Sequence, residues 1–251
     1  MVLTSSMLIQ SRNTSHDNLE LSGSMMAASL TSSSTNNRRR ARDIADCMEV
    51  GTAVGTGTYG VVYKAVDKSD PERPFVALKK IKMERETQGF PVTAIREIKI
   101  LNLMSHENVV RLREIITYDK EGDENEDYKS KGIFLGDVFM VFEYVDFDLD
   151  GLLKNPNFVV TNDIIKSYMH QLLTGVQYLH DKKLLHRDLK SANLLISKNH
   201  VLKIADWGLA RTLPPSGHKL TVPVVTLWYR SPELCFGSKL YGTEVDMWSV
   251  G

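Results

Sequence analysis

The chain has 251 residues, of which 42% are hydrophobic and 25% are charged, and its formal net charge is zero. A chain of this size can bury a sizeable core, and the balanced charge gives no reason to expect direct nucleic-acid binding. No apolar run reaches the roughly 18 residues of a membrane span, and the N-terminus has no secretory apolar block. We therefore expect no membrane partner. The two cysteines, Cys47 and Cys235, are far apart and lack metal-ligand spacing, which favours reduced thiols.

Residues 1–46 are rich in Ser, Thr and Asn and show no helical or strand periodicity, so we predict a disordered N-terminal tail. The arginine cluster in this tail, Arg38–Arg40 with Arg42, fits a nuclear import signal about as well as it fits a solvated basic run. An organelle transit peptide ranks third, because the arginines gather at one end of the segment. The folded part is therefore expected to begin near residue 47.

Two segments rich in β-branched residues, 48–54 and 61–66, flank the stretch GTGTYG at 55–60. Such a glycine pattern alone also fits a tight turn or a dinucleotide-binding loop. A dinucleotide fold needs a helix after the glycines, whereas VVYKAV favours a strand. The pattern predicts a hairpin whose tip can lie close over phosphates, because glycine carries no Cβ.

A third strand, FVALKKI, carries Lys79, and FPVTAIREIKILNLM then predicts a helix with Pro91 near its N-terminus. Glu97 lies beside the apolar stripe of this helix and could pair with Lys79. By itself, a surface glutamate is the simpler interpretation of Glu97. The acidic stretch DKEGDENED, residues 119–127, is most simply a solvated loop.

The stretch LLHRDLKSANLL, residues 184–195, places a polar cluster between leucine pairs that are suited to burial. Downstream follow VLKIADWGLAR, WYRSPE and EVDMWSVG. In this order the motifs resemble the protein kinase family over residues 48–251. The resemblance implies an α+β, two-lobed fold, with a β-rich N-lobe and hinge over residues 47–145 and a mainly helical, incomplete C-lobe over residues 146–251.

The same resemblance implies phosphoryl transfer from ATP with Mg²⁺, a reaction that asks the protein mainly for positioning and charge neutralisation. Asp188 would accept the proton of the substrate hydroxyl, and Lys190 would steady the transferring phosphate. Asn193 and Asp206 would hold Mg²⁺, while Lys79, oriented by Glu97, would contact the α and β phosphates. The residues expected to line the nucleotide site are Val54, Gly55, Thr56, Gly57, Thr58, Tyr59, Gly60, Val61, Val62, Lys79, Glu143 and Val145.

Among kinases, PVTAIRE at 91–97 and TVPVVTLWYRSPE at 221–233 are similar to the cyclin-dependent group. A mitogen-activated kinase would carry Thr-x-Tyr here, where this chain has Thr221 followed by Val222 and Pro223. FEYVDFDLDGLL and EDYKSKG resemble the branch that phosphorylates the C-terminal repeats of RNA polymerase II. The resemblance implies substrates with Ser-Pro or Thr-Pro sites and a nuclear location, with the cytoplasm as a second place.

The resemblance also names a partner and its regulation. Ile95 would insert into a pocket on a cyclin, the alternative being an ordinary core residue. Arg96, Arg187 and Arg211 would converge on phosphorylated Thr221. Thr58 and Tyr59 match inhibitory phosphorylation sites, although both could equally be plain turn residues.

Three features separate this chain from the family pattern. Trp207 stands where phenylalanine is usual, and Ser191 and Ser231 replace more common small residues. The sequence also stops at Gly251, shortly after Asp246 begins the helix that forms the axis of the lower lobe. The alternative to an active kinase is therefore a catalytically inactive, truncated module that binds a cyclin.

Overall fold

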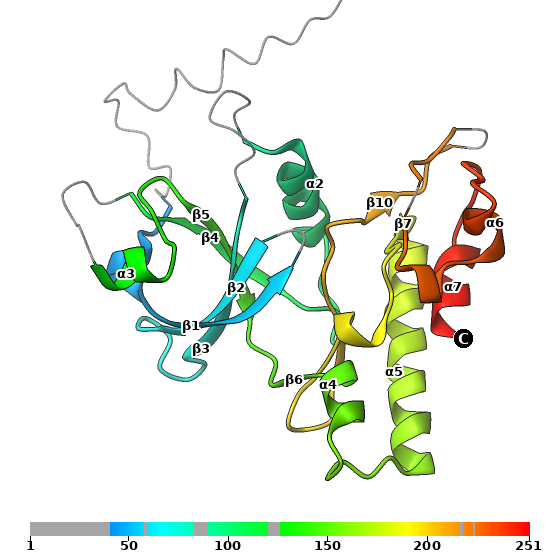
Figure 1. The fold of residues 1–251 in the computed structure, drawn as a ribbon, viewed down its shortest axis with the longest axis horizontal. Helices are drawn as coiled ribbons and strands as arrows, with labels where there is room; N and C mark the ends of the chain where they lie inside the picture. Colours follow the sequence, from blue (N-terminus) through cyan, green and yellow to red (C-terminus); the bar gives the residue numbers. More distant parts are fainter. Residues whose placement is uncertain (1–40, 58–59, 83–89, 120–125, 216–217, 223) are drawn as a thin grey trace, which may run out of the picture. The chain divides into compact units, whose positions relative to one another are not determined.

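The computed structural model describes residues 41–57, 60–82, 90–119, 126–215, 218–222 and 224–251. All of them belong to one unit, Ala41–Gly251. Its first half is built on an antiparallel sheet and its second half is mainly helical, which confirms the expected two-lobed α+β kinase fold (Figure 1).

The N-lobe sheet has the order β1-β2-β3-β5-β4. Its strands are β1 (Met48–Gly57), β2 (Gly60–Asp67), β3 (Phe75–Lys80), β4 (Leu112–Thr117) and β5 (Val138–Glu143). The glycine-rich stretch joins β1 to β2 as the predicted hairpin, with Gly57 opposite Gly60. Gly60 has φ +152°, and a Cβ at this position would collide with the carbonyl oxygen of Lys80, so only glycine fits.

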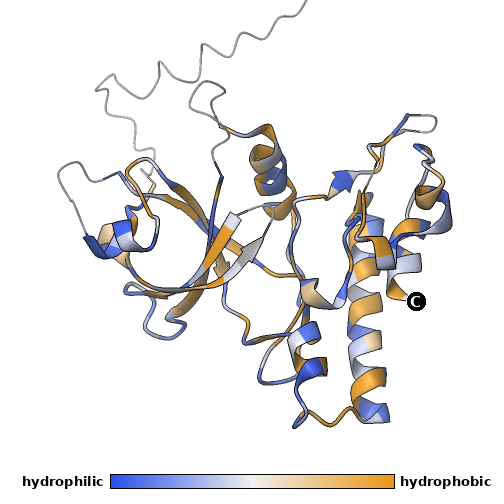
Figure 2. Cartoon of the chain, in the orientation of Figure 1, coloured by the Kyte–Doolittle hydropathy of each residue, from blue (hydrophilic) through white to orange (hydrophobic). Residues whose placement is uncertain are grey.

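Each face of this sheet has its own hydrophobic core, because side chains alternate along a strand. Val76 and Leu78 of β3 point into an outer core, which is closed by the short helix α1 (Ile44–Cys47) and by Tyr118, Tyr128 and Ile133. Ala77 and Lys79 point to the other face, toward α2 (Val92–Leu101) and the cleft. In Figure 2, β5 is hydrophobic along most of its length.

The packed part of the chain begins earlier than the boundary expected at residue 46. Ile44 is fully buried in the outer core. The Asp43 carboxylate caps α1 by accepting from the Ala45 N–H at 2.8 Å, and Arg42 pairs with Asp67 at 3.0 Å. The tail's last residues therefore belong to the N-lobe. The polar composition of that segment hid one apolar anchor and one capping residue.

The end of the acidic stretch also differs from a solvated loop. Residues 120–125 lie outside the described residues, and Glu126 begins the helix α3 (Glu126–Ser130). Tyr128 in this helix is buried, meets Tyr118 edge-on at 5.3 Å, and donates to the Met48 carbonyl at 3.4 Å. One aromatic side chain is enough to attach this hydrophilic helix to the outer core.

The C-lobe surrounds the helix α5 (Asn162–Asp181), whose N-terminus is capped by Thr161. The other elements are β6 (Phe147–Asp148), α4 (Leu149–Lys154), β7 (Leu184–Leu185), the 3₁₀ turn η3 (Ser191–Asn193), β8 (Leu194–Ile196), β9 (Leu202–Ile204), β10 (Arg211–Thr212), the 3₁₀ turn η4 (Leu227–Tyr229), α6 (Pro232–Cys235) and α7 (Glu244–Val250). In α5, Leu172 and Val176 are buried, whereas Ile165 and Met169 are exposed.

The α-helices in the described part of the chain have 4 to 20 residues. None of them is both long enough and apolar enough to cross a bilayer.

Candidate active site

One carboxylate of α7 supports the segment between β7 and β8 through hydrogen bonds. Asp246 is buried, and its two oxygens accept the backbone N–H groups of His186 at 3.0 Å and Arg187 at 2.8 Å. Arg187 has a positive φ of 66°, a conformation that is costly for a non-glycine residue. Leu185 and Leu189 are buried on either side, so the loop is fixed both by apolar packing and by Asp246.

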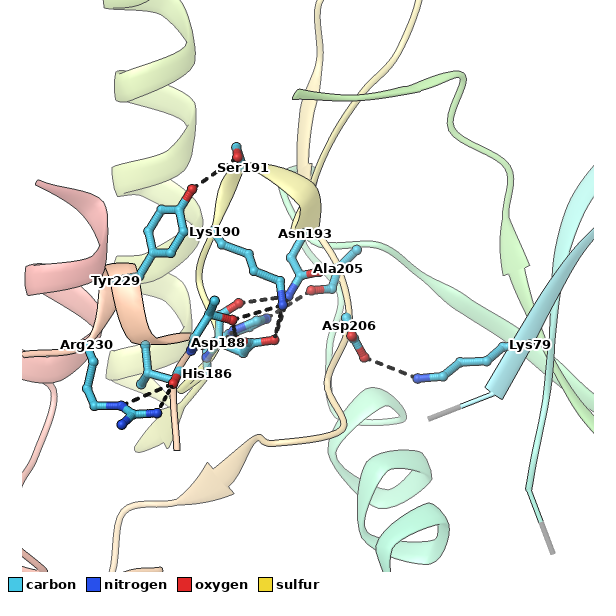
Figure 3. A network of polar contacts seen from close by, with 12 residues as sticks. Lys79, His186, Asp188, Lys190, Ser191, Asn193, Ala205, Asp206, Tyr229 and Arg230 are labelled. Carbon is cyan, nitrogen blue, oxygen red and sulfur yellow. Dashed lines mark hydrogen bonds and ion pairs between the residues drawn. The ribbon is translucent and has the colours of Figure 1, made fainter. Parts of the chain in front are cut away.

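Asp188 is the centre of the polar network in Figure 3. One carboxylate oxygen accepts from Lys190 Nζ at 2.9 Å and from Asn193 Nδ2 at 3.0 Å, and the other accepts from Thr226 Oγ1 at 2.9 Å. The side chain is only slightly exposed, and its orientation is set before any substrate arrives. Sequence reasoning brought together Asp188, Lys190 and Asn193. It missed Thr226, because a hydroxyl so far downstream gives no local signal.

Lys79 reaches the cleft from β3 and meets two carboxylates. Its Nζ lies 2.7 Å from Glu97 Oε1 of α2 and 3.3 Å from Asp206 Oδ1. Glu97 is 6% exposed, so it is not the surface glutamate of the simpler interpretation. Burial by itself lowers the pKa of Lys79, but the charges of Glu97 and Asp206 outweigh it and raise the pKa above its usual range. The lysine is therefore a fixed positive charge.

A cavity of about 570 Å³ opens beside Lys79, between the hairpin, the hinge and η3. Of the residues expected to bind the nucleotide, those that line it are Val54, Gly55, Gly60, Val62, Lys79, Glu143 and Val145. Val61 is different: it points to the opposite face and packs against the outer core, as strand alternation requires. Thr56 and Gly57 end β1, and Thr58 and Tyr59 lie outside the described residues.

The cavity also has apolar walls that sequence reasoning did not name. Ala77, Phe142 and Leu195 line it from β3, β5 and β8. The position of Ala77 could be predicted from the sequence, because Ala77 lies two residues before Lys79 and therefore shares its face of the strand. A cavity with apolar walls and a buried cation suits a planar base joined to phosphates.

The two oxygen donors expected to hold Mg²⁺, Asn193 and Asp206, both line the cavity. The Asn193 amide nitrogen donates to the Asp188 carbonyl at 2.8 Å, which directs the other end of the amide, its oxygen, away from Asp188. No group of three or more His, Cys, Asp or Glu side chains that could hold a metal occurs among the described residues. Two oxygen donors match Mg²⁺, which keeps waters and phosphate oxygens as its remaining ligands. The donor set fits that ion.

Residues 48–251 match the model of the protein kinase domain. The chain belongs to the protein kinase family. It is 51% identical to cyclin-dependent kinase C-2 of Oryza sativa subsp. japonica, over 82% of this chain and 40% of that protein. It is 49% identical to cyclin-dependent kinase C-1 of Arabidopsis thaliana, over 82% of this chain and 41% of that protein.

A third relative is cyclin-dependent kinase 9 of Danio rerio, 46% identical over 79% of this chain and 52% of that protein. This kinase thus spans about two fifths to one half of the length of these relatives.

The segment after β10 places Thr221 beside one of its three expected arginines. Arg187 Nη1 lies 3.1 Å from Thr221 Oγ1 and 2.8 Å from Tyr241 Oη, while Arg187 Nη2 is buried and has no partner among the described residues. Arg211 donates to the neighbouring carbonyl of Ala210 at 2.9 Å. Of the expected convergence on Thr221, the contact with Arg187 is formed.

Val225 and Arg230 form a second arrangement in the same segment of the kinase. Val225 has a φ of 67° and is 4% exposed. Arg230 Nη2 donates to the Val225 carbonyl at 2.9 Å and Arg230 Nε donates to the Val224 carbonyl at 3.0 Å. The Arg230 guanidinium group thus satisfies the carbonyl of the residue that has this unusual backbone conformation.

Trp207 is 2% exposed and meets the His186 ring edge-on at 5.0 Å, in the inner core that also holds Ala94 and Leu101 of α2. It therefore belongs to the same hydrophobic core as the buried side of α2. On the outer side of the same helix, Ile95 is 38% exposed and Val92 is 68% exposed. Ile95 is not an ordinary core residue in this structure.

Proposed function

We propose that this kinase transfers the γ-phosphoryl group of ATP to the hydroxyl of Ser or Thr in a protein substrate. The observation that carries the proposal is the preorganised Asp188 carboxylate, which Asn193 and Thr226 hold from two sides. Asn193 also lines the cavity, in which the Lys79–Glu97 pair is already formed. Phosphoryl transfer depends on such positioning more than on covalent chemistry by the protein.

Each side chain has a role in this proposal. Asp188 accepts the proton of the attacking hydroxyl, and Thr226 and Asn193 keep its carboxylate aimed at the cleft. Lys190 and Lys79 offer positive charge to the phosphates. Bound Mg²⁺ would be held by Asn193 and Asp206 and would neutralise phosphate charge. The glycines 55–60 cover the phosphates, and Glu143 and Val145 lie at the other end of the cavity, where a base would bind.

The substrate is proposed to carry proline after the phosphorylated residue. The support lies in the Val225 carbonyl, which accepts from Arg230 and is therefore not available to a substrate N–H. A residue with an N–H at that position would leave this donor unsatisfied, whereas proline has no N–H to satisfy. A substrate with proline at this position therefore binds without losing a hydrogen bond, whereas a substrate with any other residue there loses one.

The partner is proposed to be a cyclin that docks on α2. Ile95 and Val92 present apolar surface on the outer side of the helix whose inner side carries Glu97. Pressure on that surface would hold Glu97 against Lys79. Relatives that match over this region are named cyclin-dependent kinases, which supports the choice of partner.

Phosphorylation is proposed to control the kinase at Thr221, where the buried Arg187 Nη2 has no partner among the described residues and where Arg96 and Arg211 would complete the site. Thr58 and Tyr59 remain proposed inhibitory sites, outside the described residues. A nuclear location and action on the RNA polymerase II repeats rest on the segments FEYVDFDLDGLL and EDYKSKG.

The test of the catalytic proposal uses the kinase with a cyclin, Mg-ATP and a peptide that contains Ser-Pro. Asp188→Asn should reduce turnover by about 10²- to 10⁴-fold, the usual contribution of a general base, while the affinity for Mg-ADP stays within about twofold. Turnover equal to that of the unmodified chain would remove Asp188 from the mechanism. A chain that binds the cyclin but transfers no phosphate would support the binding-module alternative.

The partner proposal has a matched pair of variants on α2. Ile95→Glu places a charge in the proposed apolar contact and should lower cyclin affinity by at least about tenfold, because an unpaired charge is costly to bury. Thr93→Glu adds the same charge to an exposed residue on the other side of the helix and should have little effect. Binding of a cyclin panel measured by interferometry decides between them. Equal affinities for both variants would exclude Ile95 from the interface.

A further inference from the structure

Lys203 of β9 makes two contacts that cross the boundary between the lobes. Its Nζ lies 3.0 Å from Glu143 Oε1 at the end of β5 and 2.9 Å from the carbonyl oxygen of Glu107, in the connection between α2 and β4. The Lys203 side chain is only 16% exposed and that of Glu143 is 25% exposed. The ammonium group is therefore mostly withdrawn from water and joins three segments of the chain.

Glu143 is more than an ion-pair partner. Its Oε1 also accepts from the Arg111 N–H at 2.8 Å, and its own N–H donates to the Arg111 carbonyl at 3.2 Å. Glu143 lines the cavity at the hinge, at the end opposite Lys79. The position of its backbone thus determines where the base end of a nucleotide can lie.

Lys203 is also close along the chain to the residues at the phosphate end of the cavity. Lys203 lies three residues before Asp206, and it pairs across β8 with Leu195, which follows Asn193. Both proposed Mg²⁺ ligands are therefore close along the chain to the strand that carries this lysine.

The connection before β4 runs beside the same strand. Ile204 N–H donates to the Asn108 carbonyl at 2.9 Å, and Val110 N–H donates to the Ile204 carbonyl at 3.0 Å. Asn108 Nδ2 donates to the Leu202 carbonyl at 2.9 Å. Gly175 of α5 leaves room for this contact, because a Cβ there would lie 2.9 Å from Ile204 Cδ1. These hydrogen bonds fix β9 against the connection before β4. The contact between Lys203 and Glu143 therefore affects the position of Glu143 and not only its charge.

We infer that Lys203 is a positioning residue for the nucleotide, acting through Glu143 to hold the hinge at a set distance from Asp206 and Asn193. The inference rests on the proposed nucleotide site. Without the ammonium group, the Glu143 carboxylate keeps only the Arg111 N–H, and the hinge is held less firmly relative to the phosphate end of the cavity. A ligand that contacts both ends then binds less well, whereas one that contacts neither end is unaffected.

A purely structural lysine would behave differently. Removing a purely structural lysine would lower the melting temperature of the kinase and weaken the binding of every ligand alike. The positioning role predicts that Lys203→Met raises the Kd for Mg-ADP and the KM for ATP by about three- to tenfold, the worth of one partly buried charged hydrogen bond. The KM for the peptide substrate should stay unchanged. Lys203→Arg keeps the charge and the donors and should restore most of the affinity.

The experiment titrates a fluorescent ADP analogue with Mg²⁺ into the unmodified chain, Lys203→Met, Lys203→Arg, Glu143→Gln and the double variant Lys203→Met/Glu143→Gln. The control is Lys198→Met, which removes a neighbouring lysine that is 77% exposed and lies 3.6 Å from Asp146; its affinity should stay within about twofold. The double variant should bind no worse than Lys203→Met, because both changes break one interaction. Melting temperatures are measured alongside.

Equal Kd values for the unmodified chain and Lys203→Met, or additive losses in the double variant, would overturn the inference while leaving the proposed function intact. A lowered melting temperature with a parallel rise in peptide KM would overturn it in favour of a structural role. Failure of the unmodified chain to bind Mg-ADP would overturn the proposed nucleotide site and the inference together.

Discussion

Lys79 and Glu97 form an ion pair of 2.7 Å with side chains that are 12% and 7% exposed. The pair joins β3 to α2, the helix on whose outer side Ile95 lies exposed. Because the ion pair is almost dry, removing one partner leaves the other as an uncompensated buried charge.

Lys79→Met should therefore destabilise the kinase by about 3 to 5 kcal/mol and abolish turnover. The double variant Lys79→Met/Glu97→Gln should recover part of the lost stability, because it no longer leaves a buried carboxylate without a partner. It should recover none of the activity. Chemical denaturation gives the free energies of unfolding. The Glu97→Gln single variant completes the cycle, and a loss in the double variant equal to the sum of the two single losses would contradict a direct coupling between these residues.

Phosphorylation of Thr221 should order the segment around it. The phosphate would bring a charge of about −1.5 to −2 and one to three new charge-assisted hydrogen bonds, starting with the buried Arg187 Nη2 that has no partner in the described residues. We expect stronger hydrogen-exchange protection over residues 207–222 and higher turnover. Thr221→Val, treated with the same activating kinase, is the control. Unchanged protection after stoichiometric phosphorylation would exclude this role for Arg187.

Arg230→Ala should weaken the preference for proline in the substrate. The change frees the Val225 carbonyl, which could then accept an N–H from any residue other than proline. The ratio of kcat/KM for Ser-Pro and Ser-Ala peptides should fall by roughly tenfold, about the value of one hydrogen bond. Arg230→Lys keeps a donor near the carbonyl and should retain part of the preference. A ratio that does not change would place the selectivity elsewhere.

The two cysteines should react at different rates. Burial raises the pKa of the Cys47 thiol, and its Sγ lies 2.9 Å from the Asp43 carbonyl, whereas Cys235 is exposed. The thiolate is the reactive form, so at pH 8 a raised pKa leaves Cys47 mostly protonated and slow. Iodoacetamide should modify Cys235 first, and Cys47 only after unfolding. Mass spectrometry of the labelled peptides checks the order, with Cys235→Ser as the control, and similar rates would contradict it.

The sequence predicted the features that depend on local pattern. The hairpin followed from β-branched residues on both sides of the glycines, and α2 followed from its apolar stripe and Pro91. The approach of Lys79 to Glu97 was foreseen through the family resemblance, since composition alone favoured a surface glutamate. What joined these residues was knowledge of which elements meet in space.

The features that the sequence did not predict depend on single residues that are buried although their neighbours in the sequence are polar or exposed. Tyr128 anchors an otherwise hydrophilic helix, and Ile44 anchors the end of a polar tail. Lys203 looks like the solvent-facing residue of a short strand until the structure places Glu143 and Glu107 beside it. Averages over a window conceal such single residues, because burial at one position is decided by what the rest of the chain brings there.

The support of the catalytic loop by Asp246 has a consequence for the order in which the protein is made. The loop carries residues 186–193, but the carboxylate that accepts two of its backbone N–H groups lies 59 residues beyond Arg187. During synthesis, domains fold from the N-terminal side as the chain emerges, so the N-lobe sheet can form while the loop still lacks its support. The nascent kinase therefore gains its N-lobe sheet before Asp188, the proposed base, is held in place.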